Sequence, residues 1–134
     1  MTNASPPIVL IVDDEAPIRN MLAHWLQADG YRCVQAADAK AAWQQLQEYE
    51  VRVVILDVRM PGHSGVELLH EIAEHHFATA VIMLTSVNEP QTMADAIERG
   101  AVSYLIKPPD RERLLHAVRG ALSRQLLSAQ VAEA

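Results

Sequence analysis

Five short apolar segments alternate with five amphipathic segments along the chain. The apolar segments are residues 8–12, 31–35, 51–56, 80–84 and 103–106. Short apolar runs bounded by turn residues predict strands that are buried on both faces of a parallel sheet. The segments that follow them repeat apolar residues at intervals of three and four, which is the spacing of a helix with one buried face. The pattern predicts an α/β fold, a doubly wound five-stranded parallel sheet with right-handed crossovers.

Boundary signals support several of the predicted helices. Pro17 falls in the first turn of the first helix, where proline is tolerated, and Gly30 closes that helix. Residues 88–91 have the spacing of a capping box at the start of the fourth helix. Gly100 follows the same helix, as is typical of a helix C-terminus.

Length and composition fit a single folded domain. Of the 134 residues, 50% are hydrophobic but only 4% are aromatic, so we expect an aliphatic core. We predict a disordered N-terminus over residues 1–7, the folded domain over residues 8–122, and a helical extension or linker start over residues 123–134. The single cysteine, Cys33, excludes an internal disulfide and is predicted to be a buried strand residue.

The charge is unevenly distributed. Residues 1–100 carry 14 acids and 6 bases, whereas residues 101–134 carry 3 acids and 5 bases. An acidic body argues against direct nucleic-acid binding by this domain. No apolar run has the length of a membrane helix and no signal peptide is visible, so we expect a cytoplasmic protein without membrane contact.

Polar residues follow four of the five predicted strands. Asp13 and Asp14 follow the first strand and Asp57 follows the third. Thr85 follows the fourth and Lys107 follows the fifth. Because the carboxyl ends of parallel strands share one edge, where open α/β sheets build their sites, these groups are predicted to share one crevice.

The carboxylates of the predicted crevice repel one another, and a bound cation would neutralise their charge. Two carboxylates 4 Å apart repel each other by about 4 kcal/mol at an effective dielectric near 20. Either some are protonated or a cation neutralises them, and oxygen ligands with open positions suit Mg²⁺. Lys107 adds a second positive charge and is one of only two lysines in the chain. Each residue alone has an ordinary explanation, such as helix capping by Asp13 and Asp14, but their matched positions favour a common site.

In these residues the chain resembles the receiver domain of bacterial two-component response regulators. The resemblance over residues 8–122 implies a flavodoxin-like sheet with strand order 2-1-3-4-5. Pro109 departs from the family pattern, where an aromatic residue is frequent. The matching motifs are Ile11–Glu15, Leu56–Asp57, Met60–Gly62, Thr85–Ser86, Ala96–Ala101 and Tyr104–Pro108.

The resemblance implies catalytic and metal-binding roles. Asp57 would accept a phosphoryl group from a kinase histidine. Asp14 and Asp57 would bind Mg²⁺ directly, together with the backbone carbonyl of Arg59, and Asp13 would act through water. Mg²⁺ and Lys107 would neutralise charge on the phosphoryl oxygens.

The resemblance also implies switch roles. The hydroxyl of Thr85 would bond the phosphoryl oxygen after transfer, and Tyr104 would report that movement by changing rotamer. Arg59 and Val87 would tune attack by water, and the Lys107–Pro108 bond would be cis.

We therefore expect a phosphorylation-controlled signalling switch that assists its own phosphorylation and dephosphorylation but is not otherwise an enzyme. Its partners would be a sensor histidine kinase or phosphotransfer protein, and a downstream protein or fused output domain. Three alternatives remain open. They are an unphosphorylated receiver-like docking module, the N-terminal fragment of a multidomain response regulator, and a Mg²⁺-dependent phosphatase, for which the chain offers no segment long enough to form a substrate cap.

The last predicted helix is the only basic region. Its apolar stripe continues through Leu126 and Ala129, and Gly120 inside it is a candidate bend. A basic helix beside a helix of mixed charge suits a phosphorylation-dependent homodimer across a two-fold axis. The alternative is that the arginines solubilise a helix that leads into a linker. The arginines are Arg111, Arg113, Arg119 and Arg124.

Overall fold

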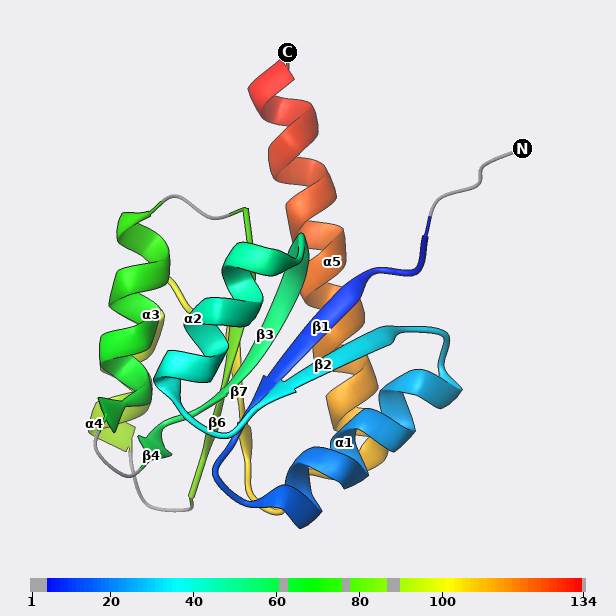
Figure 1. The fold of residues 1–134 in the computed structure, drawn as a ribbon. Helices are drawn as coiled ribbons and strands as arrows, with labels where there is room; N and C mark the ends of the chain where they lie inside the picture. The colour runs from blue at the N-terminus through cyan, green and yellow to red at the C-terminus, as the bar shows by residue number, and fades with distance from the viewer. Residues whose placement is uncertain (1–4, 61–62, 76–77, 87–89, 134) are drawn as a thin grey trace.

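A five-stranded parallel sheet forms the centre of the molecule in the computed structural model, which describes residues 5–60, 63–75, 78–86 and 90–133 (Figure 1). The strand order is β2-β1-β3-β6-β7, and all neighbouring pairs are parallel. The predicted order 2-1-3-4-5 is confirmed, because the predicted fourth and fifth strands are β6 and β7. The strands are β1 (Ile8–Val12), β2 (Arg32–Ala36), β3 (Val51–Asp57), β6 (Ala80–Thr85) and β7 (Ser103–Ile106).

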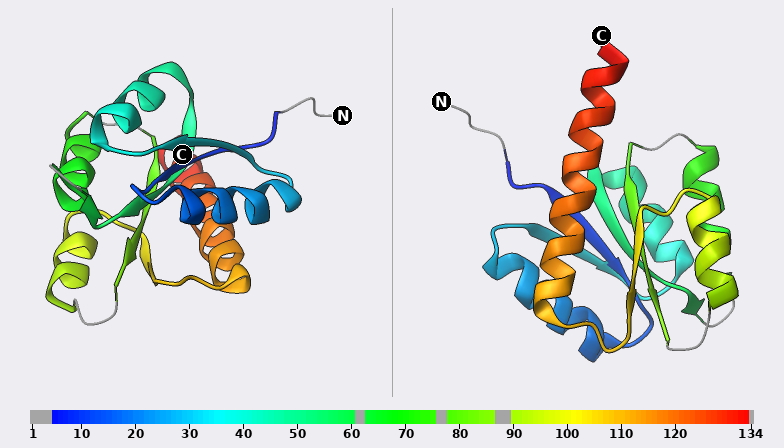
Figure 2. Two further views of the ribbon diagram at one scale, coloured as in Figure 1. Left: turned by 60° about the horizontal axis from the view of Figure 1, so that its bottom comes forward. Right: turned by 180° about the vertical axis from the view of Figure 1, so that it is seen from behind.

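Helices cover both faces of this sheet. Figure 2 shows α1 and α5 on one face and α2, α3 and α4 on the other. Successive strand residues point to opposite faces, so Leu10 packs under α2–α4 while Val9 and Ile11 pack under α1 and α5. The helices are α1 (Ala16–Ala28), α2 (Ala39–Glu48), α3 (Gly65–Glu74), α4 (Pro90–Glu98) and α5 (Arg111–Glu133).

Strand boundaries differ slightly from the predicted ones. β2 begins at Arg32 because the amide of Tyr31 bonds the carbonyl of Leu26 and so belongs to the end of α1. A small antiparallel pair, β4 (Arg59–Met60) and β5 (His63–Ser64), follows β3 where only a loop was predicted.

The prediction that Gly30 and Gly100 end helices is confirmed. Gly30 and Gly100 have φ values of 95° and 115°, which only glycine adopts readily. Residues 88 and 89 of the predicted capping box lie outside the described residues, and α4 begins at Pro90. α5 continues through Gly120 as one helix and projects beyond the sheet (Figure 1). The side chains of Leu126 and Ala129 also lie outside the described part.

Two smaller expectations are tested by the same structure. Cys33 is only partly buried, but that burial raises the pKa of its thiol to about 11, which keeps it protonated and unreactive at neutral pH. Within the described ranges, no helix combines the length and the apolar character that crossing a membrane requires.

Candidate functional site

The buried polar residues of the described chain gather at the carboxyl edge of the sheet. They are Asp13, Asp57 and Thr85, each at most 4% exposed. Asp13 directly follows β1, while Asp57 and Thr85 end β3 and β6. Polar side chains are rarely buried in an aliphatic core unless they have bonding partners, so the burial of these three residues has a local cause.

The register of the central strands brings the acids together. Val12 of β1 pairs with Leu56 of β3, so the residues that follow, Asp13 and Asp57, lie side by side. Asp13, Asp14 and Asp57 each offer a carboxylate oxygen within 4.8 Å of the other two. Asp14 is exposed, which leaves the cluster open to solvent on one side. The structure therefore confirms that these three acids share one crevice.

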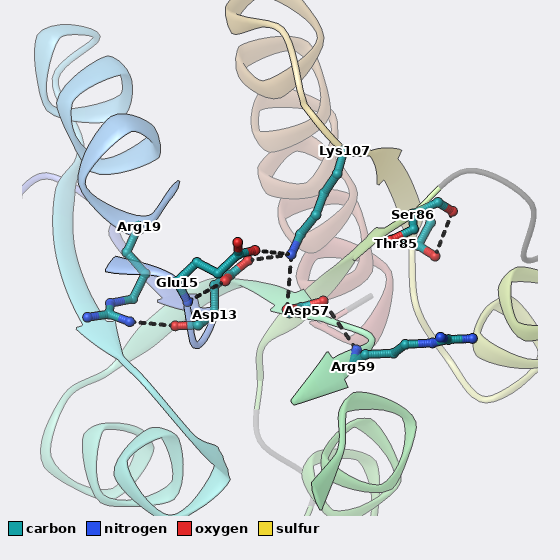
Figure 3. Close-up of polar contacts among 8 residues, drawn as sticks. All are labelled: Asp13, Glu15, Arg19, Asp57, Arg59, Thr85, Ser86 and Lys107. Atoms are coloured by element: carbon teal, nitrogen blue, oxygen red, sulfur yellow. Dashed lines mark hydrogen bonds and ion pairs between the residues drawn. The ribbon is translucent and has the colours of Figure 1, made fainter. Parts of the chain in front are cut away.

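Lys107 reaches into the same crevice from the end of β7 (Figure 3). Its Nζ lies 3.0 Å from Asp13 Oδ2 and 3.1 Å from Asp57 Oδ2. A third carboxylate, that of Glu15, lies 3.3 Å away and was not foreseen from the sequence. Burial alone would lower the pKa of Lys107, but its hydrogen bonds and charge interactions with Asp13 and Asp57 raise it above the ordinary value, so the ammonium stays charged.

Asp57 is a desolvated carboxylate held by two donors. Burial raises its pKa, and the hydrogen bond from Lys107 acts in the opposite direction. The backbone amide of Arg59 donates to its Oδ1 at 3.2 Å (Figure 3). Arg59 therefore contacts the carboxylate through its backbone, while its side chain is exposed and extends away from Asp57 (Figure 3).

The turn after β1 is held from two sides. Asp13 Oδ1 accepts a hydrogen bond from the amide of Glu15 at 2.8 Å. Arg19 of α1 donates through Nη1 to the carbonyl of Asp13 at 2.6 Å and through Nε to Gln35 of β2 at 3.2 Å. Helix α1 has Glu15 as its N-cap residue and no side-chain cap, so the alternative explanation of Asp13 and Asp14 as capping residues does not apply to this helix start.

Gly65 is a site residue that the sequence analysis missed. Its amide donates to the carbonyl of Val58 at 2.8 Å, which presses the start of α3 against the end of β3. A Cβ at this position would meet the carbonyl carbon of Asp57 at 2.9 Å and Val58 Cα at 3.0 Å, and would lie closer still to the Asp57 oxygen. The available signal was the Ser64–Gly65 pair before the third helical stripe, because the Ser64 hydroxyl caps α3.

The predicted switch residues occupy different environments. Thr85 is buried, and its hydroxyl donates to the carbonyl of Ser86 at 3.3 Å (Figure 3). Tyr104 is 44% exposed on β7, and with Ile97 and Ile106 it makes up the large exposed hydrophobic residues of the described chain. The Lys107–Pro108 bond is cis, as expected. Val87 lies outside the described residues.

The donor set fits a hard divalent cation. All its ligand atoms are oxygens, and they come from three carboxylates on one open edge. Mg²⁺ prefers such ligands and keeps water in its remaining positions. The Oδ2 atom of Asp13 is buried and has no well-aligned hydrogen bond, only its ion pair with Lys107, so it retains capacity for a bound water or cation.

The comparisons with known proteins agree with this geometry. The family model described as response regulator receiver domain matches residues 9–119. Protein PetR of Rhodobacter capsulatus is 36% identical over 92% of the chain. The phosphate regulon transcriptional regulatory protein PhoB of Pseudomonas aeruginosa is 34% identical over 87% of it. The chain covers 52% of each of these two proteins, or about half of their length.

Solved structures give the same result. The receiver domain of a LuxO repressor protein from Vibrio parahaemolyticus, itself described as putative, superposes with a TM-score of 0.88 at 26% identity, covering 94% of this chain and 97% of that one. NtrX from Brucella abortus superposes with a TM-score of 0.90 at 32% identity, covering 96% of this chain and 29% of that one.

Proposed function

The chain belongs to the response regulator receiver domain family, and we propose that it works as a switch by taking up one phosphoryl group on Asp57. The observation that carries this assignment is the arrangement at the sheet edge. A buried carboxylate lies 3.1 Å from an ammonium and within 4.8 Å of two further acids. At such a site, the ammonium and a bound cation would neutralise the negative charge of the phosphoryl oxygens. The transfer would then need no separate pocket for the rest of the donor.

In the proposed transfer, an oxygen of Asp57 forms a bond to phosphorus. The bond from phosphorus to the donor breaks at the same time, and the donor, a kinase histidine or acetate, keeps the electron pair. Asp14, Asp57 and the carbonyl of Arg59 would hold Mg²⁺ directly and Asp13 would hold it through water, and the ion would neutralise charge on the phosphoryl oxygens. Lys107, already in contact with Asp57, adds the second positive charge.

After transfer, the hydroxyl of Thr85 would turn from the carbonyl of Ser86 to a phosphoryl oxygen. Thr85 pairs with Ile106 in the sheet, two residues after Tyr104. A shift at the end of β6 is therefore passed directly to β7, which carries the exposed Tyr104. We infer that this is how phosphorylation changes the partner-binding face, because packed elements switch between discrete arrangements.

The proposed partners follow from this role. A sensor histidine kinase or a phosphotransfer protein would supply the phosphoryl group. A fused output domain or a separate downstream protein would respond to it, since the match covers only about half of PhoB, a relative named as a transcriptional regulatory protein. A homodimer formed on phosphorylation, through the basic α5 and the mixed charges of α4, also belongs to the proposal. Arg99, which directly follows α4, lies 3.6 Å from Asp95 of that helix.

Intact-mass measurement after incubation with acetyl phosphate and Mg²⁺ tests the proposal. We expect one added phosphoryl group on the wild type and none on Asp57→Asn. Asp14→Ala should be labelled much more slowly, because it removes a cation ligand. Unchanged labelling of Asp57→Asn would contradict the assignment. A wild type that never takes up a phosphoryl group would favour the docking-module alternative.

A further inference from the structure

The ammonium of Lys107 is surrounded by carboxylates in the resting site. A lysine has three N–H donors and no acceptor. Three carboxylates lie around Nζ, those of Asp13, Asp57 and Glu15, at 3.0, 3.1 and 3.3 Å. Nζ donates hydrogen bonds to Asp57 and Glu15, and Asp13 is held by an ion pair. A phosphoryl oxygen that arrives at Asp57 must therefore compete with these carboxylates for the ammonium.

The three contacts are unequal. Asp13 and Asp57 are fixed by the central strands β1 and β3 and are almost completely buried, so breaking either contact would leave a buried carboxylate without its counter-charge. The Glu15 side chain is 56% exposed and makes the longest of the three contacts. Water can rehydrate the Glu15 carboxylate as soon as it leaves, so this contact is the least costly to break.

Glu15 is nevertheless held where it can return. Its backbone amide donates to Asp13 Oδ1 at 2.8 Å, and it is the N-cap residue of α1. The backbone position is thus anchored to the acid cluster, while the carboxylate is largely exposed and faces Lys107 (Figure 3). From there it also presents a negative charge to an incoming phosphoryl group.

We propose that Glu15 is a positioning residue that holds Lys107 in the resting site and releases it when Asp57 is phosphorylated. This inference rests on the phosphorylation of Asp57 proposed above. Glu15 competes with the phosphoryl group for one donor of Lys107, so it opposes phosphoryl uptake and favours phosphoryl loss. Glu15→Gln keeps an amide oxygen in the same place and removes only the charge, whereas Glu15→Ala removes both.

The experiment compares uptake and loss in these variants. With acetyl phosphate as donor, both variants should lower the apparent KM about two- to fivefold, the range expected for one exposed ion pair, with a smaller change in the maximal rate. The phosphoryl group should survive longer by a similar factor after the donor is removed. Glu48→Gln removes the same charge from the last residue of α2, at the other end of the sheet, and should behave like the wild type.

A second measurement does not depend on phosphorylation. Proton exchange of the Lys107 ammonium with water, followed by ¹⁵N NMR in the resting protein, should be faster in both Glu15 variants than in the wild type. The exposed Lys40, the only other lysine of the chain, serves as the internal reference. A wild type that takes up no phosphoryl group overturns the proposed function, while the exchange rates still decide whether Glu15 holds Lys107.

Two results would overturn the inference itself. Exchange and uptake that match the Glu48→Gln control would show that Glu15 does not restrain the ammonium. Slower uptake in both Glu15 variants would show that Glu15 assists the transfer instead of opposing it.

Discussion

Replacing Gly65 by alanine should impair the site without changing any charged group. The added Cβ would lie 2.9 Å from the carbonyl carbon of Asp57, about half an ångström inside ordinary contact, and closer still to its oxygen. Both neighbours are backbone atoms, and no flexible side chain can yield. The start of α3 or the Asp57–Val58 peptide must therefore move by at least that amount.

The size of both effects can be worked out from this displacement. Overpacking of this kind lowers the free energy of unfolding by about 1–3 kcal/mol. A misplacement of about 1 Å costs roughly 100-fold in rate, so half of that distance at Asp57 should slow phosphorylation roughly tenfold. Urea denaturation measures the first effect, and intact-mass kinetics with acetyl phosphate and Mg²⁺ measure the second.

Gly120→Ala is the matched control. Gly120 lies inside α5, and a Cβ there would have no neighbour within 4 Å. Alanine should therefore raise the free energy of unfolding by about 1 kcal/mol through helix propensity and leave the phosphorylation rate unchanged. If Gly65→Ala matches the wild type in both stability and rate, the close approach of α3 to Asp57 does not position the nucleophile.

Three further predictions follow from the proposed switch. Thr85→Ala should still accept a phosphoryl group but lose part of the conformational response in NMR spectra; identical shift changes in variant and wild type would refute the coupling. We expect slow self-dephosphorylation of the wild type, measured as decay of the phosphorylated mass. Glu or Asn in place of Arg59 or Val87 should change this rate several-fold. An unchanged rate in all variants would show that these two positions do not control attack by water. Phosphorylation should shift the chain from monomer toward dimer in sedimentation experiments. The shift should be smaller at high salt, because the proposed contact is between charged residues and salt screens them. A chain that stays monomeric under all conditions would contradict the dimer and favour the interpretation that α5 leads into a linker.

The sequence predicts the sheet and the acid crevice because both depend on short-range signals. An apolar run that stops at Asp57 or Thr85 marks the strand and its polar end together, and parallel pairing then places those ends on one edge. The register that sets Asp13 beside Asp57 was not predictable in the same way, because it depends on an irregularity between Ile8 and Val9, where the pairing of β1 with β3 shifts by one residue.

The features that the sequence did not predict depend on distance in three dimensions. In the sequence, nothing distinguishes Glu15 from other acids. The structure places its carboxylate 3.3 Å from the ammonium of Lys107, which is 92 positions away in the chain. In the sequence, Gly65 is an ordinary residue at the start of a helix. Only the structure shows that the backbone of Asp57 lies against it. Arg19 shows no sign in the sequence of its bond to the Asp13 carbonyl. Such contacts are set by how the helices dock on the sheet, which periodicity alone does not fix.

The strand order also divides the site between regions of different local stability. Asp13 directly follows β1 and Asp57 ends β3, and both strands have hydrogen-bonded neighbours on both sides. Tyr104 lies on β7 at the edge of the sheet, and Lys107 directly follows that strand. Central strands open to solvent mainly through global unfolding, while an edge strand opens through local fluctuations of lower free energy. We therefore expect the backbone amides of β1 and β3 to exchange hydrogen slowly, and those of β7, which carries Tyr104, to exchange faster.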